Sequence, residues 1–177
     1  MHKLAFIGFG VVGQGLAEIL SKKREYLKKK YGFEYSITAV SDFKKGAAYN
    51  PEGLDPDKLL ELAASGNISE YPGAETGMDA ITTIRESNAD TVIEVTYTDI
   101  KTGQPAHDHF RAALESGRNL VTTNKGPTAL FFRELSGLAR EKGVLFRYEG
   151  TVMAGTPVLN LCETCLAGNE IREIRGI

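Results

Sequence analysis

The sequence has only two cysteines, too few for a disulfide framework. This is consistent with a reducing compartment. Cys162 and Cys165 are three residues apart, which places both on one side of an expected helix. A zinc or redox site would need a second pair or a strand-to-helix turn, and neither accompanies them. We therefore expect both to be packed core thiols.

An excess of charge and a long apolar run are also lacking. The 177 residues carry 21 basic and 23 acidic side chains, a formal net charge of -2. No global field therefore favours nucleic acid or anionic lipid. No apolar run reaches the roughly 18 residues of a membrane span, and no cleavable signal precedes the first strand-like segment at Lys3. We expect a cytoplasmic protein with a small-molecule partner, no nucleic acid and no membrane.

Strand-like and helix-like segments alternate along the chain. Strands are expected at 4–7, 35–40, 91–95, 119–123 and 144–148, and helices at 11–20, 105–116 and 128–141. This alternation predicts an α/β fold of the Rossmann type, a doubly wound parallel sheet covered on both faces. The proline- and glycine-rich stretch 44–73 is expected to be a surface excursion with one short helix near 57–64. The charged run 22–30 is expected to be the solvated end of the first helix.

Three glycines between the first expected strand and helix follow the G-x-G-x-x-G pattern. Gly8 can make the turn, Gly10 lets a pyrophosphate approach the backbone, and Gly13 allows the helix to pack closely on the strand. Free N–H groups at the helix start would face the anion. A chain with 19 glycines can also produce such a turn without a ligand. The strand-to-helix context favours dinucleotide binding.

The residue that follows the second expected strand bears on cofactor choice. Asp42 stands there after Ser41, and a carboxylate at this position accepts hydrogen bonds from a ribose 2′-hydroxyl, which favours NAD. Lys44 and Lys45 follow closely, and a cation favours the 2′-phosphate of NADP. The prediction is therefore NAD(P).

Polar residues follow three further expected strands, at the edge of the sheet where ligands bind. They are Thr96 and Tyr97, Asn124 and Lys125, and Glu149. Lys125 could be a solvated loop lysine, but its position favours an active-site cation. Glu149 could cap a helix or pair with Arg147, or bind a ligand or metal. His107 and His109 are two residues apart near a helix start and are not expected to form a metal pair.

These motifs resemble the amino-terminal part of homoserine dehydrogenase. The similar segments are 8–13, 39–42 with Gly46 and 51–55, 121–125, 148–157 and 166–176, which together span essentially the whole chain. The resemblance implies an NAD(P)-dependent oxidoreductase that interconverts L-homoserine and L-aspartate 4-semialdehyde in threonine and methionine biosynthesis. It also implies a homodimer in the full-length form.

The resemblance implies roles for individual residues. Lys125 would reach cofactor and substrate and stabilise the alkoxide that forms during hydride transfer. Thr96 and Tyr97 would lie beside the nicotinamide ribose. The backbone at Phe9, Gly10, Val11 and Val12 would hold the pyrophosphate. A sodium ion would be held through main-chain oxygens of Glu149, Val152, Ala154 and Thr156.

Members of the resembled family continue into a second domain that orients the substrate. We therefore expect residues 1–150 to form the dinucleotide-binding domain. Residues 151–177 would start an incomplete α+β domain, with a helix at 156–167 and a strand at 170–177. Such a fragment would bind NAD(P) with little turnover. Two alternatives stay open: a dinucleotide-binding regulatory module without catalysis, and another dehydrogenase acting on a semialdehyde or amino acid.

Overall fold

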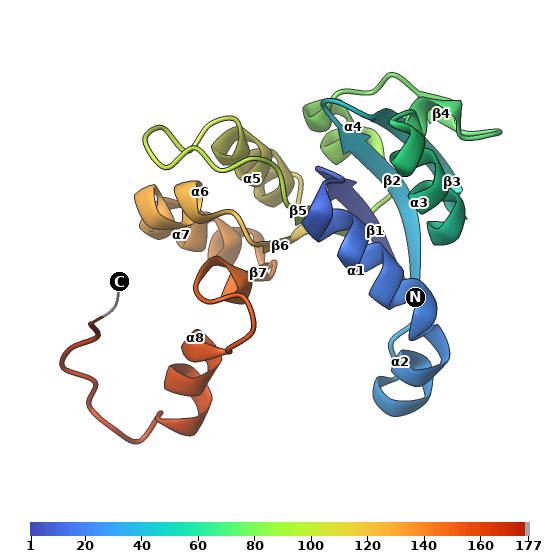
Figure 1. The fold of residues 1–177 in the computed structure, drawn as a ribbon. Helices are drawn as coiled ribbons and strands as arrows, with labels where there is room; N and C mark the ends of the chain where they lie inside the picture. Colours follow the sequence, from blue (N-terminus) through green and yellow to red (C-terminus); the bar gives the residue numbers. More distant parts are fainter. Residues whose placement is uncertain (176–177) are drawn as a thin grey trace.

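A seven-stranded sheet organises the computed structural model, which describes residues 1–175 (Figure 1). Its strands lie in the order β4-β3-β2-β1-β5-β6-β7. Five strands run parallel, namely β1 (His2–Ile7), β2 (Tyr35–Asp42), β5 (Thr91–Glu94), β6 (Asn119–Thr122) and β7 (Phe146–Arg147). From β1 the chain builds outward on one side to β2 and later on the other side to β5. The strand order therefore switches between β1 and β5, as in Rossmann-type folds, and the predicted fold class is confirmed.

The sheet is mixed rather than wholly parallel. Strand β3 (Gly46–Leu54) pairs antiparallel with β2, and the short β4 (Glu75–Thr76) pairs antiparallel with β3. The prediction of a surface excursion was wrong for β3. Gly46, with φ of 86°, makes the tight turn directly after β2. Pro51 and Gly53 lie inside the strand and conceal its alternating pattern.

The helices cover both faces of the sheet. The helices of the described residues are α1 (Val11–Lys22), α2 (Arg24–Tyr31), α3 (Pro56–Ser65), α4 (Ala80–Glu86), α5 (Ala106–Glu115), α6 (Lys125–Leu130), α7 (Phe132–Lys142) and α8 (Val158–Asn160), of which α2 and α8 do not pack on the sheet. The run 22–30 forms mostly a separate helix, α2, which has no buried residue, so its solvated character is confirmed. The helix expected at 128–141 is two helices that meet at Phe131. Helix α4 was not predicted.

Two apolar clusters, one on each face, hold the helices to the sheet. On the first face, α1 buries Gly13, Ala17 and Leu20, a helical spacing that turns one side of α1 toward the strands. On the second face, α5 buries Phe110 and Leu114 against β5 and β6. Each fully buried side chain of this size contributes about 2 kcal/mol. The clusters fix α1 and α5, two helices whose amino-terminal ends lie at the carboxyl edge of the sheet.

The segment after β7 packs loosely against the rest of the chain. Helix α8 and the π-helical turn Leu161–Cys165 take the place of the longer helix that was expected. Cys162 is partly exposed and Cys165 is exposed, so the prediction of core thiols was wrong. Residues 170–175 form no strand, because a lone strand lacks a ladder partner. The last two residues of that expected strand lie outside the described range.

Within residues 1–175 none of the helices combines the length and apolar character needed to cross a membrane.

Candidate functional site

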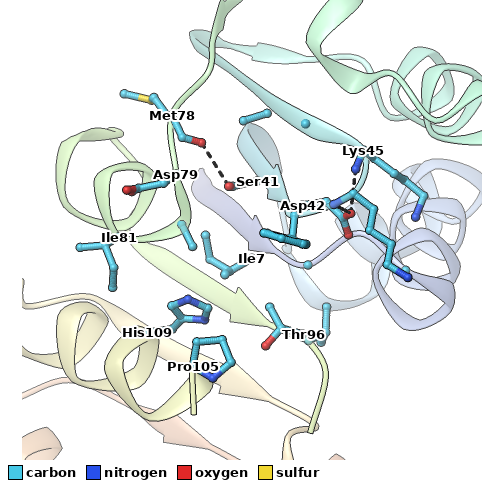
Figure 2. Close-up of a pocket in the computed structure, with 18 of the residues that line it drawn as sticks. Ile7, Ser41, Asp42, Lys45, Met78, Asp79, Ile81, Thr96, Pro105 and His109 are labelled. Carbon is cyan, nitrogen blue, oxygen red and sulfur yellow. Dashed lines mark hydrogen bonds between the residues drawn. The ribbon is translucent and has the colours of Figure 1, made fainter.

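A cavity of about 1010 Å³ opens along the carboxyl ends of β2, β1 and β5 (Figure 2). It lies where the strand order switches, the usual ligand position in such sheets. Its wall is built from the β1–α1 loop, the β2–β3 turn, the segment that leads into α4, the loop after β5 and the start of α5. The residues that line it include Gly8, Gly10, Asp42, Lys44, Lys45, Asp79, Thr96, Tyr97, Pro105 and His109.

The structure requires glycine at two of the three positions of the G-x-G-x-x-G pattern, and the third position is different. Gly8 has φ of 89°, and a Cβ there would lie 2.8 Å from the Val95 carbonyl oxygen. A Cβ on Gly13 would lie 2.8 Å from the Gly8 carbonyl oxygen, so the helix–strand approach requires glycine. A Cβ on Gly10 would have nothing within 4 Å. Gly8 and Gly13 therefore serve the fold itself, whereas Gly10 leaves room for a ligand.

The amino terminus of α1 faces the open space beside Gly10. Gly10 is its N-cap and supplies no side-chain acceptor, so the first-turn N–H groups have no partner within the helix. The side chain of Val11 is 92% exposed, while Phe9 is fully buried. The Phe9 N–H donates to Asp42 at 2.7 Å, so the amides left for a phosphate begin at Gly10. This arrangement suits an anion.

Asp42 joins the glycine loop to the β2–β3 turn. Its Oδ2 accepts the N–H of Phe9, and its Oδ1 accepts the N–H groups of Lys44 at 2.9 Å and Lys45 at 3.0 Å. Burial raises the pKa of Asp42, but these backbone donors and the charge of Lys45 outweigh it, so the pKa lies below its usual value. The carboxylate keeps acceptor capacity on Oδ2 for a ribose hydroxyl.

Replacing Asp42 by asparagine should lower the free energy of unfolding by about 2 kcal/mol at neutral pH, because an amide nitrogen must then face backbone donors. A carboxyl with a lowered folded pKa contributes stability above its unfolded value of 3.8 and loses it as the pH falls through the folded value. The deficit of Asp42→Asn should therefore shrink in acid. Urea unfolding of both proteins at neutral pH and near pH 3 measures it. A deficit that is equal at both pH values would contradict this role.

The β6–α6 corner lies against the loop after β5. Asn124 is 1% exposed, and its side-chain amide donates to the carbonyl oxygens of Tyr97 at 3.1 Å and Thr96 at 3.4 Å. A Cβ on Gly126 would lie 2.4 Å from the Asp99 carbonyl oxygen. These contacts place Lys125 beside the loop that carries Thr96 and Tyr97.

Lys125 itself differs in detail from its predicted position. Strand β6 ends at Thr122, and Lys125 is the first residue of α6 rather than part of a strand tip. Its side chain is exposed and does not belong to the cavity wall. Its catalytic role stays a prediction.

Glu149 begins the short 3-10 turn Glu149–Thr151 after β7. Its carboxylate accepts the N–H groups of Leu159 and Asn160, each at 3.0 Å, so the side chain caps the start of α8. A Cβ on Gly150 would lie 2.7 Å from the Thr123 methyl group, which brings this turn against the end of β6. The capping alternative for Glu149 is therefore present in the structure.

The predicted sodium ligands are main-chain oxygens of Glu149 and of the exposed loop that follows this turn. The carbonyl oxygen of Glu149 accepts the N–H of Val152 at 3.3 Å, and that of Thr156 accepts the N–H of Val158 at 2.9 Å. Each oxygen keeps a second lone pair, so main-chain coordination by the set that includes Val152 and Ala154 is compatible with this loop. No group of three His, Cys, Asp or Glu side chains within residues 1–175 is placed to hold a metal. The sodium site stays a prediction.

Sequence reasoning missed a buried acid–imidazole pair at the cavity. Glu94, the last residue of β5, is fully buried, and its Oε1 lies 3.3 Å from Nδ1 of His109. The signal was a glutamate inside the apolar run 91–95, because a charged residue is seldom fully buried without a partner. His109 was considered only as half of a metal pair.

Comparisons with known proteins agree on one family. A family model described as homoserine dehydrogenase, NAD binding domain, matches residues 8–149. The chain is 42% identical over 175 residues to a homoserine dehydrogenase of Methanocaldococcus jannaschii, covering 98% of this chain and 52% of that protein. It is 41% identical to an NAD(+)-dependent homoserine dehydrogenase of Pseudomonas canavaninivorans, covering 99% and 50%. The chain thus spans about half the length of these relatives.

The fold has solved counterparts. A hyperthermophilic archaeal homoserine dehydrogenase in complex with NADPH superposes with a TM-score of 0.79 at 28% identity, covering 94% of this chain and 49% of that chain.

Proposed function

The chain belongs to the homoserine dehydrogenase family, and on that premise we propose that it binds NAD(P) and supplies Lys125 for the interconversion of L-homoserine and L-aspartate 4-semialdehyde. One observation supports the proposed NAD(P) binding: the open space beside Gly10 faces the uncapped amino terminus of α1. That combination fits a pyrophosphate. The NADPH complex of the archaeal relative supports the same ligand class.

The proposed cofactor would lie along the cavity, with one part of the dinucleotide at each of the following groups. The amides of Gly10, Val11 and Val12 hold the pyrophosphate. Asp42 accepts from the adenosine ribose, and Lys44 and Lys45 place two cations where a 2′-phosphate would lie. When bound, the nicotinamide supplies or accepts the hydride.

The other end of the cavity is formed by the loop after β5. Thr96 and Tyr97 line it, and Asn124 fixes this loop against the corner that carries Lys125. Lys125 lies outside the wall, from where its ammonium group stabilises negative charge on the substrate oxygen.

Titration of the chain with NADH and NADPH, followed by an assay of homoserine-dependent NAD(P)+ reduction, tests the proposal. Binding together with turnover supports it in full. Binding without turnover favours a dinucleotide-binding regulatory module, or a part that needs the remainder of the family fold. Turnover of another semialdehyde or amino acid in place of homoserine would point to a different dehydrogenase. Failure to bind either nucleotide would exclude the proposal.

A further inference from the structure

Helix α2 and the two lysines before it carry a concentrated positive charge. This basic segment, residues 22–31, has six basic side chains and one acidic side chain, a net charge of +5. The whole chain has a net charge of -2, so the other residues together carry -7. The balanced composition of the chain therefore conceals a separation of charge.

The surface of α2 is open to solvent in this chain. No side chain of α2 is buried, and Leu27 is its one half-buried residue. The helix extends beyond the edge of the sheet at which β1 begins (Figure 1). Lys23 and Lys29 are exposed and have no ion-pair partner among residues 1–175. Their charges are therefore available to a partner.

An acidic surface adjoins the basic segment at the start of α3. It consists of the exposed residues Glu52, Asp55, Asp57 and Glu61, with Lys58 as the only basic residue between them in the sequence. Ser21, near the end of α1, donates its hydroxyl to the Asp57 carboxylate at 2.8 Å. This hydrogen bond brings the acidic surface directly beside the residues that lead into α2.

Adjoining surfaces of opposite sign are complementary to themselves across a two-fold axis. When two copies face each other, the basic segment of each copy lies on the acidic surface of the other, so the attraction occurs twice. A uniformly anionic partner, such as a nucleic acid, would instead be repelled by the acidic surface next to α2. The charge pattern therefore favours a second copy of this chain over a polyanion.

We propose that α2 and the start of α3 form an interface between two copies of this chain, with the basic segment of each copy on the acidic surface of the other. Tyr26 and Tyr31 of α2 are 50% and 63% exposed and supply aromatic contact area, which is typical of the residues that contribute most to interface energy. The cavity beside Gly10 stays open, because α1 begins at the carboxyl edge of the sheet and leads away from it to α2.

Sedimentation velocity over a range of protein concentrations tests the proposal. The chain should form dimers at about 20 mM salt, and the dissociation constant should rise by about tenfold at about 300 mM salt, because exposed charges are screened. Lys23→Glu combined with Lys29→Glu should weaken the dimer by about tenfold at low salt and leave the fold intact, as circular dichroism would show. The matched control, Lys101→Glu combined with Lys142→Glu, makes the same change in net charge at exposed lysines elsewhere and should dimerise like the parent.

A charge exchange tests whether the two surfaces are partners. Glu52→Lys combined with Glu61→Lys should also weaken the dimer, because the acidic surface then repels α2 of the other copy. Mixing this variant with the one altered at Lys23 and Lys29 should restore dimers, since opposite charges face each other again in both contacts. A fluorescent label on the Glu52 and Glu61 variant detects these mixed dimers.

Three results would overturn the proposal. One is a chain that stays monomeric at low salt, and another is a dimer that neither salt nor the substitutions in the basic segment weaken. The third is open-ended growth into larger assemblies, because a two-fold interface closes. Binding of a single-stranded oligonucleotide to α2 of a monomeric chain would assign this helix to nucleic acid and would likewise exclude the proposed interface.

Discussion

Replacing Lys125 by alanine should slow homoserine-dependent NAD(P)+ reduction by about a thousandfold, because a charge placed at a developing alkoxide is worth that much. The fold should remain intact, since the Lys125 side chain is exposed and its removal leaves no cavity. Its backbone position is independent of the side chain, because Asn124 and Gly126 on either side fix the corner. Steady-state kinetics and thermal unfolding measure the two effects.

Lys101 offers the matched control for this prediction. It is an exposed lysine in the loop after β5 and does not line the cavity, so Lys101→Ala removes a nearby charge without removing the proposed catalytic one. Its turnover should stay within about twofold of that of the parent chain. Equal and measurable turnover in Lys125→Ala and the parent would exclude Lys125 as the group that stabilises the substrate oxygen.

The second large effect is expected at Gly8. Gly8→Ala should lower the free energy of unfolding by about 3 kcal/mol and abolish nucleotide binding, because two penalties coincide there. The backbone is left-handed, with φ of 89°, and the new Cβ would meet the Val95 carbonyl oxygen at 2.8 Å. The β1–α1 loop must then move away from β5. Urea unfolding with an NADH titration measures both losses.

A substitution at Gly32 measures the cost of the left-handed backbone without the cost of a steric clash. It also has a left-handed backbone, with φ of 64°, but a Cβ there would have nothing within 4 Å. Gly32→Ala should therefore cost only about 1 kcal/mol and leave nucleotide binding unchanged. If both variants lost the same stability, the close approach to Val95 would have no energetic weight and the proposed packing of the loop would be wrong.

Local patterns predicted the part of the site that one strand and one turn define. The strand–glycine–helix order at Gly8, Gly10 and Gly13 is a local signal, because the whole pattern lies in the short segment that joins β1 to the start of α1. The apolar runs also predicted that one strand ends just before Thr96 and another just before Asn124. Their hydrogen-bonded contact was only implied, since parallel strands end at the same edge of a sheet.

The features that were missed or wrong depend on contacts between distant residues. Strand β3 owes its place to pairing with β2, which overrides the weak strand preference of Pro51 and Gly53. Cys162 and Cys165 lie on a helix with apolar spacing, but nothing in residues 1–175 packs over them enough to bury them. The Glu94–His109 contact joins residues 15 apart in sequence, on a strand and a helix, and periodicity does not report such pairs.

In the proposed function, a dinucleotide places its pyrophosphate in the open space beside Gly10. Gly10 and Gly15 both have open space around an added Cβ, and Gly15 lies one turn further along α1. Isothermal titration calorimetry of Gly10→Ala, Gly15→Ala and the parent chain with NADH tests this position of the pyrophosphate. We predict that Gly10→Ala binds about a hundredfold more weakly while its unfolding free energy changes by less than about 1 kcal/mol, and that Gly15→Ala binds like the parent. Equal affinity in all three proteins would contradict the claim.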